Sequence, residues 1–365
     1  MANPKIQITT TTSSPSVVPA GRVVIGLVGT APSGATKAVG SLELLSNASQ
    51  AGYGSTGTIP DALTGIAANA NTHVIVVRVQ DTPTESQLVA GIVQLETAEG
   101  KFGERPDFLL CPGFTWEGGD SPTPAASGVA AQLQTTAEKL DSVAIIAARP
   151  GTVAQAKTWA GNNRGKRLFT VFPHIVPVGG TATVDPAPYV AGALSKYPLT
   201  VNPLWKNIQG IKSLDPAISF SPHGTTGSDS DLLQSDLITG IVQHNGFHLF
   251  GSRMLVEPTS TDDDRFINVL RVVDDVRRHL INASLNAWGR NVTTAFFDDV
   301  VNSVQNIIDT LVAGEALRPG STVVKHPTKN TEAALSAGQA FFAVNLRIVY
   351  PVAEINFDVN TGTGD

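Results

Sequence analysis

The chain has 365 residues, of which 42% are hydrophobic and only 15% are charged, and its formal net charge is −6. An average soluble chain has about 25% charged residues, so this composition indicates a surface that largely faces other protein. The negative balance excludes a global basic field of the kind that holds nucleic acid or anionic lipid. The apolar content excludes wholesale disorder.

The cysteine content and the hydropathy pattern bear on the cellular compartment. Cys111 is the only cysteine, which excludes an internal disulfide framework and fits a reducing cytoplasm. It follows the apolar run Phe108–Leu110, so we expect a small core side chain and not a reactive thiol. No run approaches the ~18 apolar residues of a membrane span, and no apolar stretch follows Lys5, so we expect neither membrane insertion nor secretion.

Strand and helix patterns alternate from about residue 22 to about residue 180. Apolar runs of buried-strand length lie at Val23–Gly29, Val74–Val79, Phe108–Leu110, Val143–Ala147 and Leu168–Val171. Helices are expected between them at Asp61–Asn71, Thr84–Ala98, Ala125–Leu140 and Val153–Asn163. Repeats of this kind, at about 30-residue spacing, predict a mostly parallel sheet covered on both faces, which is an α/β domain.

Prolines break this alternation in residues 181–235, where we expect an extension of the α/β domain. Further on, Asn245 and Gly246 stand between two runs of alternating apolar residues in Gly240–Phe250. An Asn-Gly pair in that setting predicts a β-hairpin.

Two long amphipathic helices are expected next. Thr261 before Asp262–Asp264 has the pattern of a helix cap with an acidic first turn, and apolar residues then recur at alternating three- and four-residue spacings as far as Leu280. The second helix is expected at Thr294–Leu311, with an inward face made of Phe297, Val300, Val301, Val304, Ile307, Ile308 and Leu311.

Both ends of the chain carry isolated strand patterns. The Thr/Ser stretch Gln7–Ser14 favours an extended chain but has too few apolar groups to bury itself. Near the other end, alternating strands are expected at Phe342–Ile348 and Glu354–Asn360. A lone strand needs a sheet edge that something else supplies. The residues expected to form these two arms include Ile6, Ile8, Thr10, Thr12, Ile355, Phe357 and Val359.

The candidate sites for chemistry are weak. Gly29–Thr36 has the glycine spacing of a phosphate-binding loop after a strand, but Ala35 occupies the position of the essential lysine and Lys37 comes two residues late. A glycine-rich turn is therefore favoured over a nucleotide site. His244 and His248 are four apart, but the turn at Asn245 predicts that they lie on opposite arms of the hairpin and not together on a metal.

The remaining polar clusters do not form a catalytic set either. Asp262–Asp264 lacks the alternate-residue spacing of a Ca²⁺ loop. No G-x-S-x-G nucleophile elbow occurs, and Ser121 has no partner of the Asp-x-x-His type downstream. Glu117 and Asp120 are more simply exposed loop acids. We expect no enzyme activity, no metal and no cofactor.

Several stretches resemble the contractile tail sheath proteins of bacteriophages and R-type bacteriocins. Val24–Pro32 (VIGLVGTAP) looks like the family's first core strand and turn, and Gly52–Leu63 (GYGSTGTIPDAL) is similar to the glycine-rich segment before its first helix. Val76–Val79 stands where the family has its second strand. Arg105–Phe114 (RPDFLLCPGF) matches a characteristic strand of the form R-P, hydrophobic residues, P-G, and Lys139–Ala147 is similar to the helix–strand step that follows.

The most specific match is the hairpin motif. Asn245–Leu255 (NGFHLFGSRML) resembles the family's G-[FY]-R-[LF]-W-G-N-R-T, and Arg265–Val276 follows at the expected distance. The family's arginine, tryptophan and asparagine are replaced here by His248, Phe250 and Ser252, which leaves the subfamily open. The residues that carry the motif in the hairpin and helix are Gly246, Phe247, Gly251, Arg253, Phe266, Asn268 and Arg271.

The resemblance covers roughly residues 22–360 and implies a structural subunit with mixed α/β and α+β folds. An outer α/β insertion domain (22–249, with the proline-rich extension 181–235) would sit on an inner α+β domain built from both chain termini. The inner domain would comprise the N-terminal strand arm (1–21) and residues 250–365, which include the C-terminal strand arm 341–360. In the family such arms add strands to neighbouring subunits, which agrees with the lone terminal strands.

The resemblance also implies partners and a location. The implied partners are other copies of the chain, which form hexameric rings stacked helically, a tail tube protein, and baseplate and tail terminator proteins. Neither nucleic acid binding nor membrane insertion is expected. The protein would belong to a virion tail assembled in the host bacterial cytoplasm, and its sheath would contract to drive the tube through the host envelope for genome ejection.

The second predicted helix supplies a hypothesis on the tube contact. It carries Asp298, Asp299 and Asp309, and no Lys or Arg occurs from Asn291 to Leu317. If this helix faces the tube, the tube surface should be basic; a solvated acidic face is the alternative. For the whole chain, the alternatives are a non-phage contractile device (bacteriocin, injection or secretion system) and a nucleotide-binding α/β enzyme.

Overall fold

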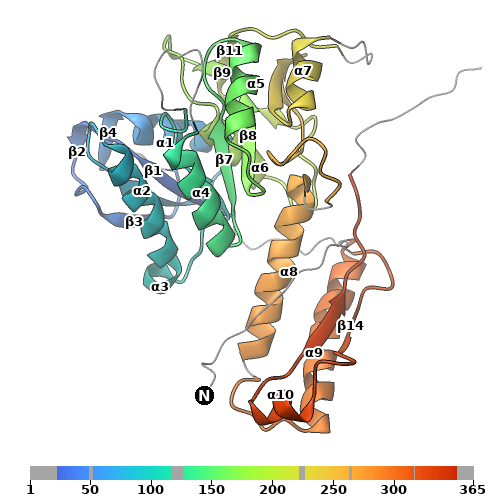
Figure 1. Cartoon of the computed structure of the whole chain (residues 1–365). Coiled ribbons are helices and arrows are strands. Elements are labelled where there is room, and N and C mark those ends of the chain that lie inside the picture. The colour runs from blue at the N-terminus through green and yellow to red at the C-terminus, as the bar shows by residue number, and fades with distance from the viewer. Residues whose placement is uncertain are drawn as a thin grey trace, which may run out of the picture.

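A computed structural model describes residues 23–351, except 49–51, 117–125, 222–226, 263–264, 286 and 316. The predicted arms at Ile6–Thr12 and Ile355–Val359 lie outside these residues, as do Glu117 and Asp120. Figure 1 shows an α/β body from which one long helix, α8, leads to a smaller unit formed by α9, α10 and β14. None of the described helices has the length and apolar content that crossing a bilayer requires.

The body is built on one nine-stranded sheet, in the order β10-β13-β12-β8-β7-β6-β1-β5-β3. Its central strands β5, β1, β6, β7, β8 and β12 run parallel, while β3, β13 and β10 are antiparallel to their neighbours. The predicted parallel sheet is confirmed. The strands are β1 (Val24–Gly29), β3 (Leu42–Leu45), β5 (His73–Arg78), β6 (Phe108–Leu110), β7 (Val143–Ala147), β8 (Leu168–Phe172), β10 (Asn207–Ile208), β12 (Thr239–Gln243) and β13 (Phe247–Phe250).

Helices cover both faces of this sheet. On one face α2 packs against α4, and on the other α1 packs against α6 (Figure 1). Close packing needs small residues: a Cβ on Gly91 of α2 would lie 3.0 Å from Val28 of β1, and one on Gly65 of α1 would lie 2.6 Å from the Tyr189 ring of α6. The helices of the body are α1 (Thr58–Ala67), α2 (Glu85–Gln94), α3 (Ala98–Phe102), α4 (Gly128–Lys139), α5 (Val153–Asn162), α6 (Ala187–Ser195) and α7 (Asp229–Ser235).

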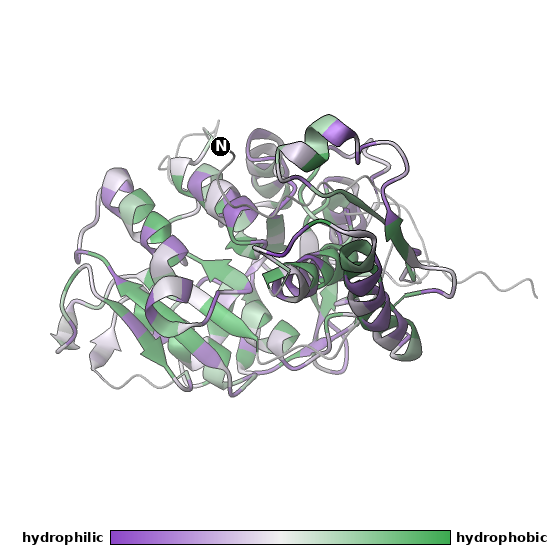
Figure 2. Ribbon diagram, turned by 90° about the horizontal axis from the view of Figure 1, so that it is seen from below, coloured by the Kyte–Doolittle hydropathy of each residue, from purple (hydrophilic) through white to green (hydrophobic). Residues whose placement is uncertain are grey.

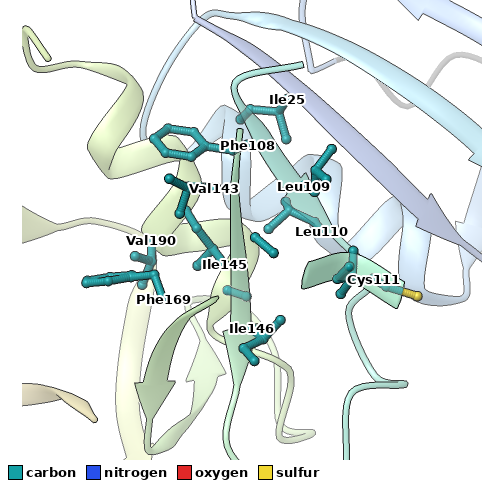
Figure 3. Packing of buried hydrophobic residues seen from close by; sticks show 14 of the residues in the cluster. Ile25, Phe108, Leu109, Leu110, Cys111, Val143, Ile145, Ile146, Phe169 and Val190 are labelled. Carbon is teal, nitrogen blue, oxygen red and sulfur yellow. The ribbon is translucent and has the colours of Figure 1, made fainter. Parts of the chain in front are cut away.

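The core lies between the sheet and these helices. Phe108, Ile145 and Phe169 are fully buried and pack together from three neighbouring strands (Figure 3). Cys111 is 1% exposed, so the predicted core role of this side chain is confirmed. Full burial of a large apolar side chain such as Phe108 contributes about 1.5–3 kcal/mol to stability. In Figure 2 the strands of the sheet are mostly hydrophobic, whereas the helices have one hydrophobic and one polar face, so the sheet lies at the centre of the hydrophobic core.

The proline-rich region has more regular structure than the sequence predicted. It contains α6, α7, β10 and β11 (Ile211–Asp215), and β11 pairs with β9 (His174–Pro177) outside the main sheet. Pro186 and Pro188 do not interrupt α6 because they stand at its first turn, where a helix has no use for the missing N–H. A two-stranded pair, β2 (Ser33–Ala35) with β4 (Tyr53–Thr56), flanks the other end of the body.

The predicted hairpin is confirmed, and the predicted start of the next helix is wrong. β12 and β13 pair across Asn245 and Gly246, whose φ angles of 51° and 123° suit a tight turn. Helix α8 (Ile267–Leu285) does not begin after Thr261. Phe266, the residue before the helix, instead bridges to Arg253, and Asp262 forms an ion pair with Lys166 (2.9 Å).

The second unit has its own small core. Helix α9 (Thr294–Ala313), capped by Thr293, packs on α8, and buried side chains from both meet Val323 of β14 (Thr322–Lys325). Strand β14 pairs with β15 (Phe342–Asn345), and α10 (Glu332–Ser336) lies between them in the chain. The strand predicted at Phe342–Ile348 is shorter than expected, because Ile348 leaves the ladder to pack against Val269.

Candidate functional site

The carboxyl edge of the sheet, where α/β enzymes bind their ligands, is closed by the chain itself. After Gly29 the chain forms β2 and not a helix, so the phosphate loop considered above has no helix N-terminus. The Thr30 N–H donates to Thr58 Oγ1 (3.0 Å), and the Thr58 N–H donates to Thr30 Oγ1 (3.3 Å). These backbone N–H groups, which would bind a phosphate in a nucleotide site, are therefore already hydrogen-bonded within the protein.

Asp185 closes the neighbouring part of the same edge. Its carboxylate is buried and accepts the N–H groups of Gly113 (2.9 Å) and Ala187 (2.8 Å), which ties the loop after β6 to the start of α6. Burial raises the pKa of Asp185 to about 6, and the two backbone hydrogen bonds act against that rise. The crevice between β1 and β6, which is the switch point of the sheet, is filled by Thr58 and Asp185.

The two histidines of the hairpin meet an aromatic side chain and not a metal. His248 stacks on Trp205 with ring centres 4.8 Å apart, and His244 lies 5.8 Å from the same ring. Within the described residues no group of three or more His, Cys, Asp or Glu side chains could hold a metal ion. The pair therefore packs the hairpin against the loop before β10.

The motif residues turn the chain from the hairpin into α8. Gly251 has φ 148°, and a Cβ there would lie 2.8 Å from the Thr239 backbone and 2.5 Å from Gln234 Nε2. The Arg253 guanidinium lies over the Phe266 ring (5.8 Å), and Phe247 pairs with both β12 and β10. Asn268 is buried one turn before Arg271. These residues bring α8 to the opposite, amino-terminal edge of the sheet.

At that edge, charged side chains of α8 meet charged residues that precede the strands. Arg167, just before β8, forms a two-pronged pair with Asp274 of α8, with Nη2 to Oδ1 at 3.0 Å. Arg278 binds Asp107, just before β6, and also donates to the Asp141 carbonyl (3.0 Å). We call this group the α8 joint; its members are Asp107, Asp141, Arg167, Arg271, Asp274, Asp275, Arg277 and Arg278.

The α8 joint is largely removed from water. The side chains of Arg167 and Asp274 are 9% and 3% exposed. Burial acts to lower the pKa of Arg167, but the Asp274 carboxylate, together with Asp141 and Glu138, more than offsets this and raises the pKa above its ordinary value. Arg277 adds an ion pair to Asp141 (2.9 Å) at the rim. A buried pair of this geometry anchors α8 to the start of β8, since loss of either partner leaves a buried charge without its counterion.

Comparison with known proteins identifies the fold. No family model matches the chain. It is 26% identical over 277 residues to a protein of Pseudomonas aeruginosa (strain UCBPP-PA14) described as a prophage major tail sheath protein, covering 74% of this chain and 68% of that one. It is 25% identical over 333 residues to the major tail sheath protein of Serratia phage KSP20, covering 83% of this chain and 79% of that one. The chain is a homologue of contractile tail sheath proteins.

Solved sheath structures share the fold along the chain. The sheath of an extracellular contractile injection system (PVC, contracted state) matches with TM-score 0.71 and 14% identity, covering 100% of this chain and 98% of that one. The contracted helical sheath of the anti-feeding prophage matches with TM-score 0.70 and 17% identity, covering 99% and 100%. The fold expected from the resemblance is thus confirmed.

The other residues expected to act in a sheath lie on α9 or outside the described part. Asp298, Asp299 and Asp309 are exposed on α9, and Asp299 pairs with Arg290 (2.6 Å) just before the helix. Of the α8 joint, only Arg271 was among the site residues predicted from the sequence; the other seven members were not. A signal was present, because Asp107, Asp141 and Arg167 each stand at or just before the start of an apolar strand run.

We predict that Arg167→Met lowers the free energy of unfolding by about 3–5 kcal/mol, because it leaves the Asp274 carboxylate buried without its partner. The double variant Arg167→Met with Asp274→Leu should recover most of that loss. Urea denaturation of the full chain measures both.

Lys166→Met is the matched control, since this neighbouring residue makes an exposed pair with Asp262, and its loss should change the stability far less than Arg167→Met does. Equal losses in Arg167→Met and Lys166→Met would contradict a buried pair that positions α8.

Proposed function

We propose that the chain is a structural subunit of a contractile tail sheath, which surrounds a tail tube and contracts to drive the tube through the host envelope for genome ejection. The observation that carries this is the homology to phage tail sheath proteins over most of the chain. The subunit is not an enzyme, and the ligand crevice filled by Thr58 and Asp185 supports that. One solved neighbour is the sheath of an extracellular contractile injection system, which supports a non-phage contractile device as the second candidate.

Neighbouring subunits are linked by strand addition to the sheet of β14 and β15. Each of these strands is paired along one side only within the described residues, and the exposed residues of β14 include Val324, which is 45% exposed. An open edge of this kind accepts an extended segment through main-chain hydrogen bonds. The segments that fit are the N-terminal arm around Ile6–Thr12 and the C-terminal arm around Ile355–Val359.

The chain divides into an inner domain (1–21 and 250–365) and an outer domain (22–249). Support comes from the hydrophobic cores, because the cluster of α9, β14 and β15 is separate from that of the main sheet, although Met254–Val256, Ile267 and Leu270 pack in the core of the main sheet. The inner domain would stack as hexameric rings around the tube and contact baseplate and terminator proteins at the ends. The assembled sheath would be part of a virion tail built in the host cytoplasm.

We predict that the purified full chain forms rings or tubes in negative-stain electron microscopy and that removal of residues 1–20 abolishes them. Ile6→Pro with Ile8→Pro should act like the truncation, because proline removes the N–H groups that pair in a strand. Ile6→Val with Ile8→Val is the control and should assemble. Tubes formed by the truncated chain would contradict the role of the N-terminal arm in linking subunits. A monodisperse globule formed by the full chain would contradict the proposed sheath function.

Helix α9 is the segment proposed to face the tube. Asp298, Asp299 and Asp309 are exposed on it, and the basic residue that meets them in the structure is Arg290, which neutralises only Asp299. A basic tube surface would complement the remaining charge. The alternative is that this face is merely solvated.

Reversal of charge tests the contact. Asp298→Lys with Asp299→Lys should weaken co-assembly with the tube in the extended state, and the wild-type interaction should weaken as salt is raised. Glu138→Lys, an exposed reversal on α4 of the body, is the control in sedimentation of mixed sheath and tube. Unchanged co-assembly of the α9 variant would remove the proposal.

A further inference from the structure

The middle of α8, which joins the two units of the chain, carries charged side chains between two apolar stretches. Ile267 and Leu270, at the start of α8, belong to the core of the main sheet, whereas Val276 and Leu280 belong to the core shared with α9. The residues between them on α8 are mostly charged. A close-packed apolar joint admits one arrangement, but charged side chains can exchange partners with little loss of packing.

One cation of the α8 joint has no carboxylate. Arg271 is only 6% exposed and its guanidinium lies over the Phe108 ring at 4.8 Å. Its Nε and Nη2 atoms are buried and donate a hydrogen bond to no partner among the described residues. Burial lowers the pKa of Arg271 to about 10, and Asp107 acts against that fall. Arg271 thus stays charged at neutral pH without an ion pair.

The carboxylates around Arg271 are held by other groups. Asp107 binds Arg278 and the Val24 N–H, and Asp274 binds Arg167. Asp275, one turn after Arg271 on the same helix, is the exception. Its Oδ2 is buried and receives no hydrogen bond from the described residues, and His279 Nδ1 is 3.5 Å from it. The joint therefore contains one cation and one anion that are both incompletely paired.

Room for rearrangement exists beside these groups. A cavity of about 10 Å³, roughly the space of one water molecule, lies among Arg271, Arg278, Asp107, Asp141 and Asp274. If Arg271 took Asp107, Arg278 would be released to take Asp275, three residues earlier on α8. That second arrangement keeps every existing carboxylate paired and adds one more pair. The two arrangements differ by a small turn of α8 against the sheet edge.

We propose that the α8 joint is a two-position coupling in which Arg271 is the spare cation: as α8 turns, Arg271 takes Asp107 from Arg278, and Arg278 takes Asp275. The α/β body and the unit of α9 then change their relative orientation without opening either core. This device belongs to the single subunit, so it goes beyond the proposed function and does not depend on assembly.

The test is a distance measurement in the full chain. Spin labels at Thr135→Cys on α4 and Asn302→Cys on α9, both exposed positions, report the two units, and the buried Cys111 should remain unlabelled. Labelled chain is diluted with unlabelled chain so that only distances within a subunit are read. Double electron–electron resonance should show two distances in the otherwise wild-type chain. With Arg271→Met, a residue of similar volume, the second distance should be lost.

Thermal unfolding separates this role from a merely structural one. Arg271→Met should leave the melting temperature unchanged or raise it, because it removes a buried charge that has no partner. Arg277→Met, which removes a cation already paired with Asp141, should keep both distances. A single distance in the wild-type labels would overturn the proposal. So would a lower melting temperature for Arg271→Met with an unchanged distance distribution.

Discussion

The arrangement of the two units depends on the buried pair of Arg167 and Asp274. It joins the start of β8 to the middle of α8, across 107 positions of sequence. Because the apolar cores end on either side of it, hydrophobic packing alone does not set the angle between the units. Each of these buried charges needs the other as its partner, so this contact anchors the middle of α8 to the start of β8.

The two edges of the sheet consequently have different uses. The carboxyl edge is closed by Thr58 and Asp185, each of which satisfies backbone N–H groups that a ligand would need. The amino edge receives α8 and through it the rest of the chain. In the proposed sheath, a sheet arranged in this way carries load between subunits and binds no substrate. In that proposal, the same α/β scaffold that serves enzymes elsewhere would act as a rigid body with one movable attachment through α8.

The sequence predicted those parts of the fold that local patterns determine. The apolar runs at β1, β5, β6, β7 and β8, the Asn245–Gly246 hairpin and α9 all follow from periodicity and turn chemistry. The start of α8 was predicted wrongly, because Thr261 is a good cap in isolation, whereas Phe266 bridges to Arg253 and the helix begins only after it. Most of the α8 joint was missed for the same reason: which aspartate meets which arginine is decided only when the sheet edge is assembled.

The central claim is that two separate cores meet at a charged joint, and native-state hydrogen exchange of the full chain tests it most directly. The account predicts two opening free energies: a higher one shared by the central strands β1, β6, β7 and β8, and a lower one shared by α9, β14 and β15. The amides of α8 should divide between them near Arg271. A single opening free energy common to both units would contradict the account.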